Sequence, residues 1–203
     1  MYERIFLPNE VILIEDIVKN WFETEGTGFL FIDASYISNP SNPEYVNFGS
    51  QCRIYTTKED GSTYGQGIPN QFFNSLYKKG SEAFLIGIRN NERFRTNIGL
   101  ACRFWGATIE LSYYGESGEL LGMEEKFINS NEVIQYRFPY ELDGGYIKVL
   151  LKDSDFCWAY ISIVDNISGD AVYYPLLEDL WDIDLKYENF SSLQRILYNN
   201  KSD

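Results

Sequence analysis

The chain has 203 residues, of which 30 are acidic and 17 basic, so its formal charge is −13. This charge repels phosphate backbones and anionic lipid headgroups, which makes nucleic acid and bare membrane poor partners. The sequence contains no histidine, which excludes a Ser-His-Asp triad, a Cys-His pair and a histidine-based zinc site. Aromatic residues make up 17% of the chain, and a composition rich in tyrosine and phenylalanine predicts an all-β protein.

The N-terminal segment combines a short helix with a strand. Apolar residues three or four apart predict an amphipathic helix within residues 11–22, although its opening run Val-Ile-Leu-Ile also suits a strand. Residues 29–32 predict a core strand, and residues 39–43 a loop. No apolar run reaches the roughly 18 residues of a membrane-spanning helix, so we expect no membrane insertion. The first eight residues do not form a secretory leader, so the chain is either cytoplasmic or an extracellular protein whose leader has been removed.

Further strands are predicted where apolar and polar residues alternate between turn residues. Residues 63–69 are predicted as a bulged edge segment, because two glycines and a proline weaken strand pairing. The strands cover residues 47–57, 82–89, 94–102, 109–113, 119–128, 133–138, 146–152 and 157–164. The last of these is apolar on both faces, which predicts a central strand. Seven strand-like runs about ten residues apart fit an immunoglobulin-like β-sandwich.

A weak internal repeat suggests that one sandwich unit is duplicated. Three segments of the first half reappear in the same order in the second half. Residues 6–12 resemble 127–134, residues 28–32 resemble 145–149, and residues 67–69 resemble 173–175. The first half has no counterpart of residues 94–121. We therefore predict an incomplete first sandwich half at 1–89, a second immunoglobulin-like unit at 90–175, and an acidic amphipathic tail at 176–203. This tail, helical or extended, packs on its own sandwich or docks a partner.

The cysteines and acidic loops give no clear site. Cys52, Cys102 and Cys157 allow at most one internal disulfide, and we expect buried free thiols instead. Acidic residues within 153–155 and 165–170 offer oxygen ligands for calcium, but they lack the spacing of a helix–loop–helix calcium site. We therefore predict no cofactor, with calcium as the alternative.

Two motifs resemble a known kind of module. They are Arg95-Thr96-Asn97-Ile98-Gly99-Leu100 and Val164-Asp165-Asn166-Ile167-Ser168-Gly169-Asp170, followed by Tyr174-Pro175. They resemble poorly characterised immunoglobulin-like modules repeated in large secreted or surface proteins of bacteria, and the resemblance covers roughly residues 5–175. It implies an extracellular, non-catalytic β-sandwich without an attached ligand or active site. The chain departs from the pattern at residues 101–105, where such modules often continue with Asn-Pro-Gly, and in the unmatched tail.

The leading hypothesis is a non-catalytic module, extracellular or at the cell surface, with a structural, adhesive or protein-interaction role. Its partner is another protein or a second copy that pairs with an edge strand. The first alternative is a carbohydrate-binding module in which tyrosine and tryptophan rings form a face for polysaccharide or a partner. The residues of this predicted face are Tyr114, Trp158, Tyr160, Tyr173 and Tyr174. The second alternative is a hydrolase that uses two carboxylates about 5 to 9.5 Å apart in one cleft.

Overall fold

The computed structural model describes residues 7, 10–25, 30, 32, 49–70, 78–153 and 156–178. Their regular structure is almost entirely β, and all the strand pairs are antiparallel, so the all-β prediction is confirmed. The chain divides into two compact units, Met1–Gly49 and Ser50–Asp203. Within the described residues, no helix is long and apolar enough to span a membrane.

The first unit contains the helix α1 (Ile17–Phe22), which is shorter than the predicted 11–22. Its N-cap is Asp16, whose carboxylate accepts a hydrogen bond from the backbone N–H of Lys19 at 3.4 Å. Residues 11–14 form no regular structure, because three of the four are β-branched and lose side-chain freedom in a helix. The predicted strand at 29–32 falls largely, and the loop at 39–43 entirely, outside the described residues.

The second unit begins with a hairpin of β1 (Cys52–Thr57) and β2 (Thr63–Ile68). β1 lies within the strand predicted at 47–57, whereas the bulge predicted in residues 63–69 is not found, because β2 pairs with β1 in an unbroken register. Asp60 stabilises the turn by accepting a hydrogen bond from the backbone N–H of Ser62 at 2.9 Å. Every residue of β1 is exposed, so neither of its faces contributes to a core.

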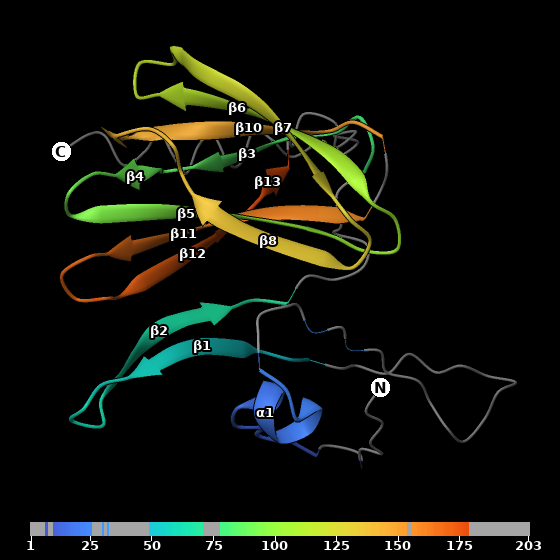
Figure 1. Ribbon diagram of the computed structural model, residues 1–203, viewed down its shortest axis with the longest axis vertical. Helices are drawn as coiled ribbons and strands as arrows, with labels where there is room; N and C mark the ends of the chain where they lie inside the picture. Colours follow the sequence, from blue (N-terminus) through green and yellow to red (C-terminus); the bar gives the residue numbers. More distant parts are fainter. Residues whose placement is uncertain are drawn as a thin grey trace, which may run out of the picture. The chain divides into compact units, whose positions relative to one another are not determined.

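Two larger sheets follow, drawn in Figure 1. The five-stranded sheet has the order β13 (Leu177–Glu178), β3 (Glu82–Ile86), β10 (Gly145–Leu151), β6 (Ala107–Gly115), β7 (Leu120–Ile128). The four-stranded sheet has the order β12 (Ala171–Pro175), β11 (Cys157–Asp165), β5 (Phe94–Cys102), β8 (Glu132–Arg137). Two short strands, β4 (Arg89–Asn90) and β9 (Leu142–Asp143), pair with each other. In the sequence, β4 lies between β3 and β5, and β9 lies between β8 and β10. β11 lies between β12 and β5, so its predicted central position is confirmed.

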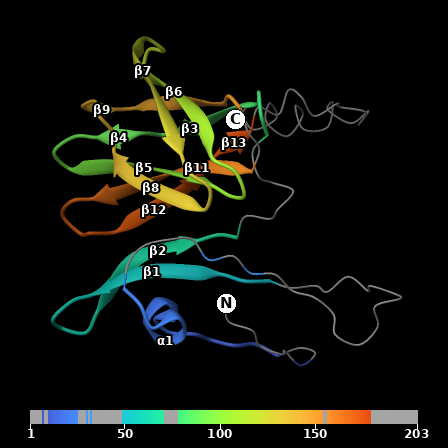
Figure 2. The same ribbon diagram turned by 45° about the vertical axis from the view of Figure 1, so that its right-hand side comes forward.

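The core lies between these two sheets, which appear as stacked layers in Figure 2. Both sheets turn alternate apolar side chains inward, among them Leu85, Leu111, Ile147, Ile98, Leu100 and Ile161. Each such side chain contributes about 1.5–3 kcal/mol when fully buried. Every second residue of each strand therefore points to an outer face. On the four-stranded sheet β2 covers part of this face, since Ser162 is buried and its hydroxyl donates to Oε1 of Gln66 at 2.9 Å.

The sandwich includes strands on both sides of the predicted boundaries at 89/90 and 175/176. β3 precedes the first boundary and pairs with β10, while β13 follows the second and pairs with β3. Gly87 adopts a positive φ of 81°, which ends β3 and divides the strand predicted at 82–89. β12 and β13 were not predicted as strands. Of the predicted tail, residues 179–203 lie outside the described part of the chain.

Candidate functional site

β7 forms one end of the five-stranded sheet in the described part of the chain and carries three exposed apolar side chains, Leu120, Met123 and Phe127. Its side chains alternate, so that Met123, Glu125 and Phe127 point to the outer face. Met123 is 57% and Phe127 63% exposed. Tyr113 pairs with Gly122 whereas Tyr114 pairs with Leu120, which places a β-bulge in β7 before Gly122.

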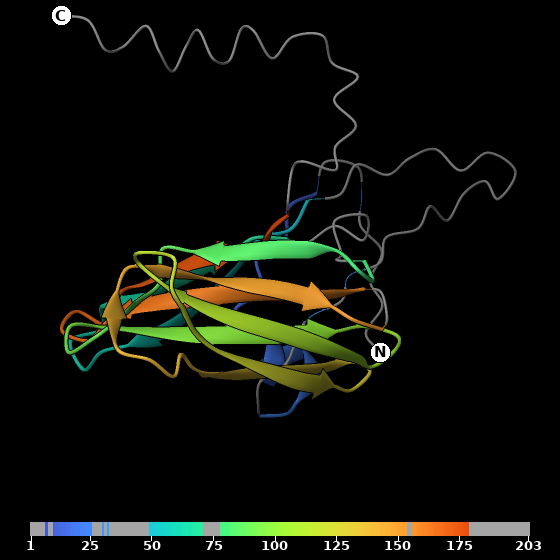
Figure 3. The same ribbon diagram turned by 90° about the horizontal axis from the view of Figure 1, so that it is seen from above.

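Other apolar side chains continue this surface across the sheet, whose strands lie side by side in Figure 3. We call it the outer apolar face, and its exposed members are Ile86, Leu120, Met123, Phe127 and Leu177. Half-buried rings lie between them: Tyr114 and Tyr146 stack at 4.6 Å between centroids, and Phe84 meets Tyr146 edge-on at 6.2 Å. Charged side chains, Glu110, Glu125 and Lys148, point to the same side, so this face is apolar in parts. Exposed apolar groups on a sheet face are a common feature of surfaces that bind other molecules.

On the inner side of β7, a carboxylate links the two sheets. Oε1 of Glu124 accepts hydrogen bonds from the hydroxyls of Tyr113 on β6 and Tyr136 on β8, the latter at 2.8 Å. Its Oε2 lies 2.9 Å from Nζ of Lys126. We call these four residues the Glu124 cluster. Because β8 belongs to the other sheet, the cluster joins the two layers where β7 and β8 follow each other in the chain.

The protonation states in this cluster are fixed at neutral pH. Burial raises the pKa of both tyrosines, and their hydrogen bonds to the carboxylate raise it further. Burial alone would raise the pKa of Glu124, but hydrogen bonds from Tyr113, Lys126 and Tyr136 outweigh it and lower the pKa below its usual value. The phenols stay protonated and the carboxylate stays ionised, so the cluster is suited to holding the edge of the sandwich rather than to transferring protons.

The five residues of the predicted ring face lie in three different places. Tyr114 is on the outer face of the five-stranded sheet, next to Tyr146. Trp158, Tyr160 and Tyr173 lie on the outer side of the four-stranded sheet, because their neighbours in β11 and β12 alternate toward the core. Tyr174 is opposite Ile161 and points the other way from Tyr173. The structure therefore does not bring these residues together as one face.

Tyr160 and Tyr173 nevertheless form a compact local arrangement. Their rings stack at 4.9 Å between centroids, and the Tyr160 hydroxyl donates to Oε1 of Gln135 on β8 at 2.9 Å. The Tyr160 ring covers Gly99 on β5, where an added Cβ would lie 2.0 Å from the ring. Burial raises the pKa of both tyrosines. Gly99 thus leaves the space that lets a ring lie across the sheet.

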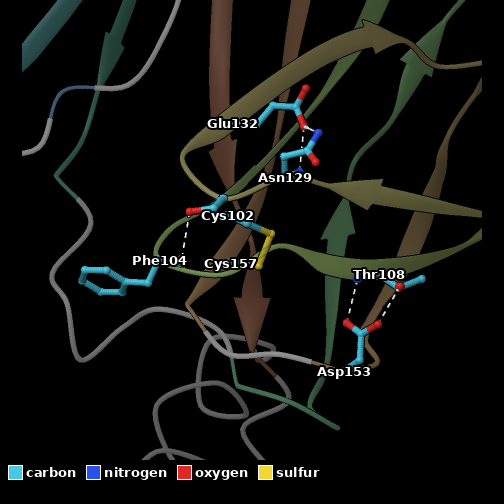
Figure 4. The surroundings of a disulfide bond; sticks show 8 residues. Cys102, Phe104, Thr108, Asn129, Glu132, Asp153 and Cys157 are labelled. Carbon is cyan, nitrogen blue, oxygen red and sulfur yellow. Dashed lines mark hydrogen bonds between the residues drawn. A yellow bond between two sulfur atoms is a disulfide. The ribbon is translucent and has the colours of Figure 1, made fainter.

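The acidic loops use their carboxylates within the fold. Both carboxylate oxygens of Asp153 accept hydrogen bonds from Thr108, one from its backbone N–H and one from its hydroxyl, each at 2.7 Å (Figure 4). Asp165 accepts hydrogen bonds from the backbone N–H groups of Ile167 and Ser168 in the β11–β12 turn. Among the described residues, no three acidic or cysteine side chains form a group that could hold a metal ion.

Two other carboxylates face each other on the outer side of the five-stranded sheet. Glu110 on β6 is directly opposite Glu125 on β7, and both contact Nζ of Lys152. The hydrogen bond to Glu125 raises the pKa of Lys152. The two carboxylates lie on a sheet face and share the Lys152 ammonium group, whose positive charge offsets their mutual repulsion.

Cys102 and Cys157 form a disulfide between β5 and β11, shown in Figure 4. The expectation of buried free thiols was wrong for these two residues, because the register of the two strands places them directly opposite each other. It was also wrong for Cys52, whose thiol is free but exposed. The disulfide lies in the core, so it joins the central strands of the four-stranded sheet from the inside.

The sequence reasoning did not single out the exposed side of β7 or the Glu124 cluster. The alternation in residues 120–128 was a usable signal, because it places Met123 and Phe127 on the side opposite Ile128. The alternation does not show which of the two sides is buried, and the burial of Ile128 in the structure decides this.

No family model matches the chain, and no curated protein matches it. Among solved structures, it is similar to Thermotoga maritima 1070, known from a crystal structure, with 13% sequence identity and a TM-score of 0.39. The match covers 49% of this chain and 93% of the other.

Proposed function

We propose that this chain is a non-catalytic β-sandwich module of the extracellular space or the cell surface, with a structural or adhesive role that depends on binding a second copy of itself. The exposed β7 edge and the outer apolar face beside it carry this proposal. Strand edges flanked by exposed apolar side chains readily pair with another chain. A second copy is the favoured partner because β7 holds both members of complementary pairs: Glu124 with Lys126, and Met123 with Phe127.

The pairing of the central strands supports an immunoglobulin-like arrangement. In that fold, strands B and E share one sheet, while C′, C and F share the other. β5 pairs with β8, and β6 lies between β7 and β10, which corresponds to the same set of neighbours. The other strands differ from the immunoglobulin order, because β3 lies beside β10 and β11 beside β5. We therefore propose the likeness for the five central strands.

The disulfide supports an extracellular location over the cytoplasmic alternative. Disulfides persist in oxidising surroundings and are rare in the reducing cytosol. The Cys102–Cys157 bond is buried in the core, where it stabilises the fold instead of serving as an exposed redox centre.

Sedimentation equilibrium over a wide range of protein concentration tests the proposed self-association. We expect a monomer–dimer equilibrium that is weakened in the double variant Met123→Lys/Phe127→Lys. A matched control is Ile167→Lys, because Ile167 is 82% exposed in the β11–β12 turn. The control should associate like the wild type. A wild-type chain that stays monomeric throughout, or a control that is weakened equally, would contradict the proposal.

A carbohydrate-binding function is the second candidate, favoured by the line of rings Phe84, Tyr146 and Tyr114 on the outer apolar face. Tyr114 and Tyr146 stack on each other, and a sugar would contact the half-buried rings where they reach the outer face. Isothermal titration with soluble polysaccharides separates the two functions. Binding that is lost in Tyr146→Ala and retained in Met123→Lys/Phe127→Lys would favour carbohydrate.

A further inference from the structure

Glu125 lies at the centre of the regular part of β7, with three residues of that part on either side. The bulge interrupts the β6–β7 register between Tyr113 and Tyr114, so regular pairing of β7 covers residues 122–128. Asn131 adopts a positive φ of 58° in the turn that follows. Glu125 is the midpoint of this regular segment. A strand with a regular segment of this kind can pair with its own copy around a central residue.

We propose that two copies pair their β7 strands antiparallel, with a two-fold axis through Glu125 perpendicular to the sheet, which joins the two five-stranded sheets into one continuous sheet. This inference rests on the proposed self-association and specifies its surface and register. An axis perpendicular to the sheet makes the outer faces of the two copies continuous. Residues equally distant from Glu125 then face each other, one from each copy.

On the inner side, this register pairs opposite charges. Glu124 of one copy faces Lys126 of the second copy, and the reverse pair lies on the other side of the axis. Within each copy the same two side chains are already in contact at 2.9 Å, so the dimer extends an existing ion pair into four alternating charges. Cross-strand pairs of opposite charge stabilise antiparallel pairing, whereas like charges oppose it.

On the outer side, the register pairs apolar side chains. Met123 of each copy faces Phe127 of the other, and both are more than half exposed in the single chain. One contact brings like charges together, because the Glu125 side chains of the two copies meet at the axis. Each of these carboxylates already forms an ion pair with Lys152 of its own copy. The adjacent registers are worse: an axis at Glu124 opposes two Glu124 carboxylates on the inner side, and an axis at Lys126 opposes two ammonium groups.

The pairing predicts a weak, reversible dimer. A seven-residue strand pair is about 23 Å long, and it buries less surface than the roughly 1,600 Å² of a standard interface. We therefore expect a dissociation constant in about the micromolar range. Such a contact suits a surface module whose many copies act together, because linked copies bind with higher effective concentration.

Cysteine cross-linking tests the register. All variants carry Cys52→Ser, because Cys52 is the exposed free thiol. Under mild oxidation, Glu125→Cys should cross-link to itself. Met123→Cys and Phe127→Cys should each cross-link poorly alone, but well when the two proteins are mixed. Glu116→Cys, in the exposed β6–β7 loop, measures random collisions. Circular dichroism of each variant checks that it is folded.

Ile86→Lys separates edge pairing from stacking of the outer faces. Ile86 is on the same face as Met123 but on β3, which is separated from β7 by the two strands β10 and β6. Edge pairing predicts that Ile86→Lys changes the dissociation constant less than twofold, while Met123→Lys raises it at least tenfold. A dimer that Ile86→Lys disrupts, or that does not cross-link at Glu125→Cys above the Glu116→Cys level, would overturn this inference and leave the proposed self-association standing. A chain that is monomeric at every concentration would overturn both.

Discussion

Loss of the disulfide between Cys102 and Cys157 should lower the free energy of unfolding by about 4 kcal/mol. The bond joins residues separated by 55 positions in the sequence. It removes conformations from the unfolded chain, and the chain-entropy relation for a loop of this length gives about 4 kcal/mol near room temperature. Since domains are stable by only about 5–15 kcal/mol, this loss would leave the sandwich marginally stable.

Urea denaturation of the double variant Cys102→Ala/Cys157→Ala measures this effect against the wild type. Cys52→Ala is the matched control, and because Cys52 is exposed we expect a change within about 0.5 kcal/mol. Thiol titration of the unfolded, unreduced wild type provides an independent count and should find one reactive thiol of the three cysteines. Three reactive thiols, or a destabilisation of the double variant below about 1 kcal/mol, would refute this reasoning.

Three further predictions concern the sandwich itself. Because the folded pKa of Glu124 is below its ordinary value of 4.5, its ionised form stabilises the fold above that pH, and the contribution is lost as the pH falls through the folded pKa. Below pH 4.5 the free energy of unfolding should therefore fall more steeply with decreasing pH in the wild type than in Glu124→Gln. Equal slopes would contradict a stabilising role of the ionised Glu124 carboxylate. Tyr136→Phe removes one hydrogen bond to this carboxylate and should cost about 1.5–3 kcal/mol in urea denaturation; a neutral variant would mean that the hydroxyl is not bonded to Glu124. Gly99→Ala should cost about 1–3 kcal/mol by displacing the Tyr160 ring, as thermal denaturation can show. Gly67→Ala, where an added Cβ would meet its nearest neighbour at 4.0 Å, should be nearly neutral, and equal melting temperatures for the two variants would exclude a clash at Gly99.

Alternation of apolar and polar residues predicted most strands of the sandwich because their buried sides are consistently apolar. β5 is an example: Ile98 and Leu100 alternate inward, and the strand matches its predicted bounds. The same rule could not predict which strands pair. β3 and β10 lie about sixty residues apart in the chain, and only their common burial against the other sheet places them together.

The candidate site was less predictable because periodicity assigns a side to each residue but not a sheet to each strand. Tyr114 and Tyr160 both point outward from their strands, yet the strands belong to different sheets. The cysteine pair was hidden for the same reason. Cys102 and Cys157 become neighbours only through the β5–β11 register, which depends on the whole set of strand pairs.

Amide hydrogen exchange of β7 as a function of protein concentration tests the central claim most directly. If two copies pair through this strand, the amides within residues 122–128 that point away from β6 should exchange more slowly as the concentration rises through the dissociation range. The amides of β8, the end strand of the other sheet, should exchange at the same rate throughout. Exchange in β7 that is independent of concentration would contradict the account.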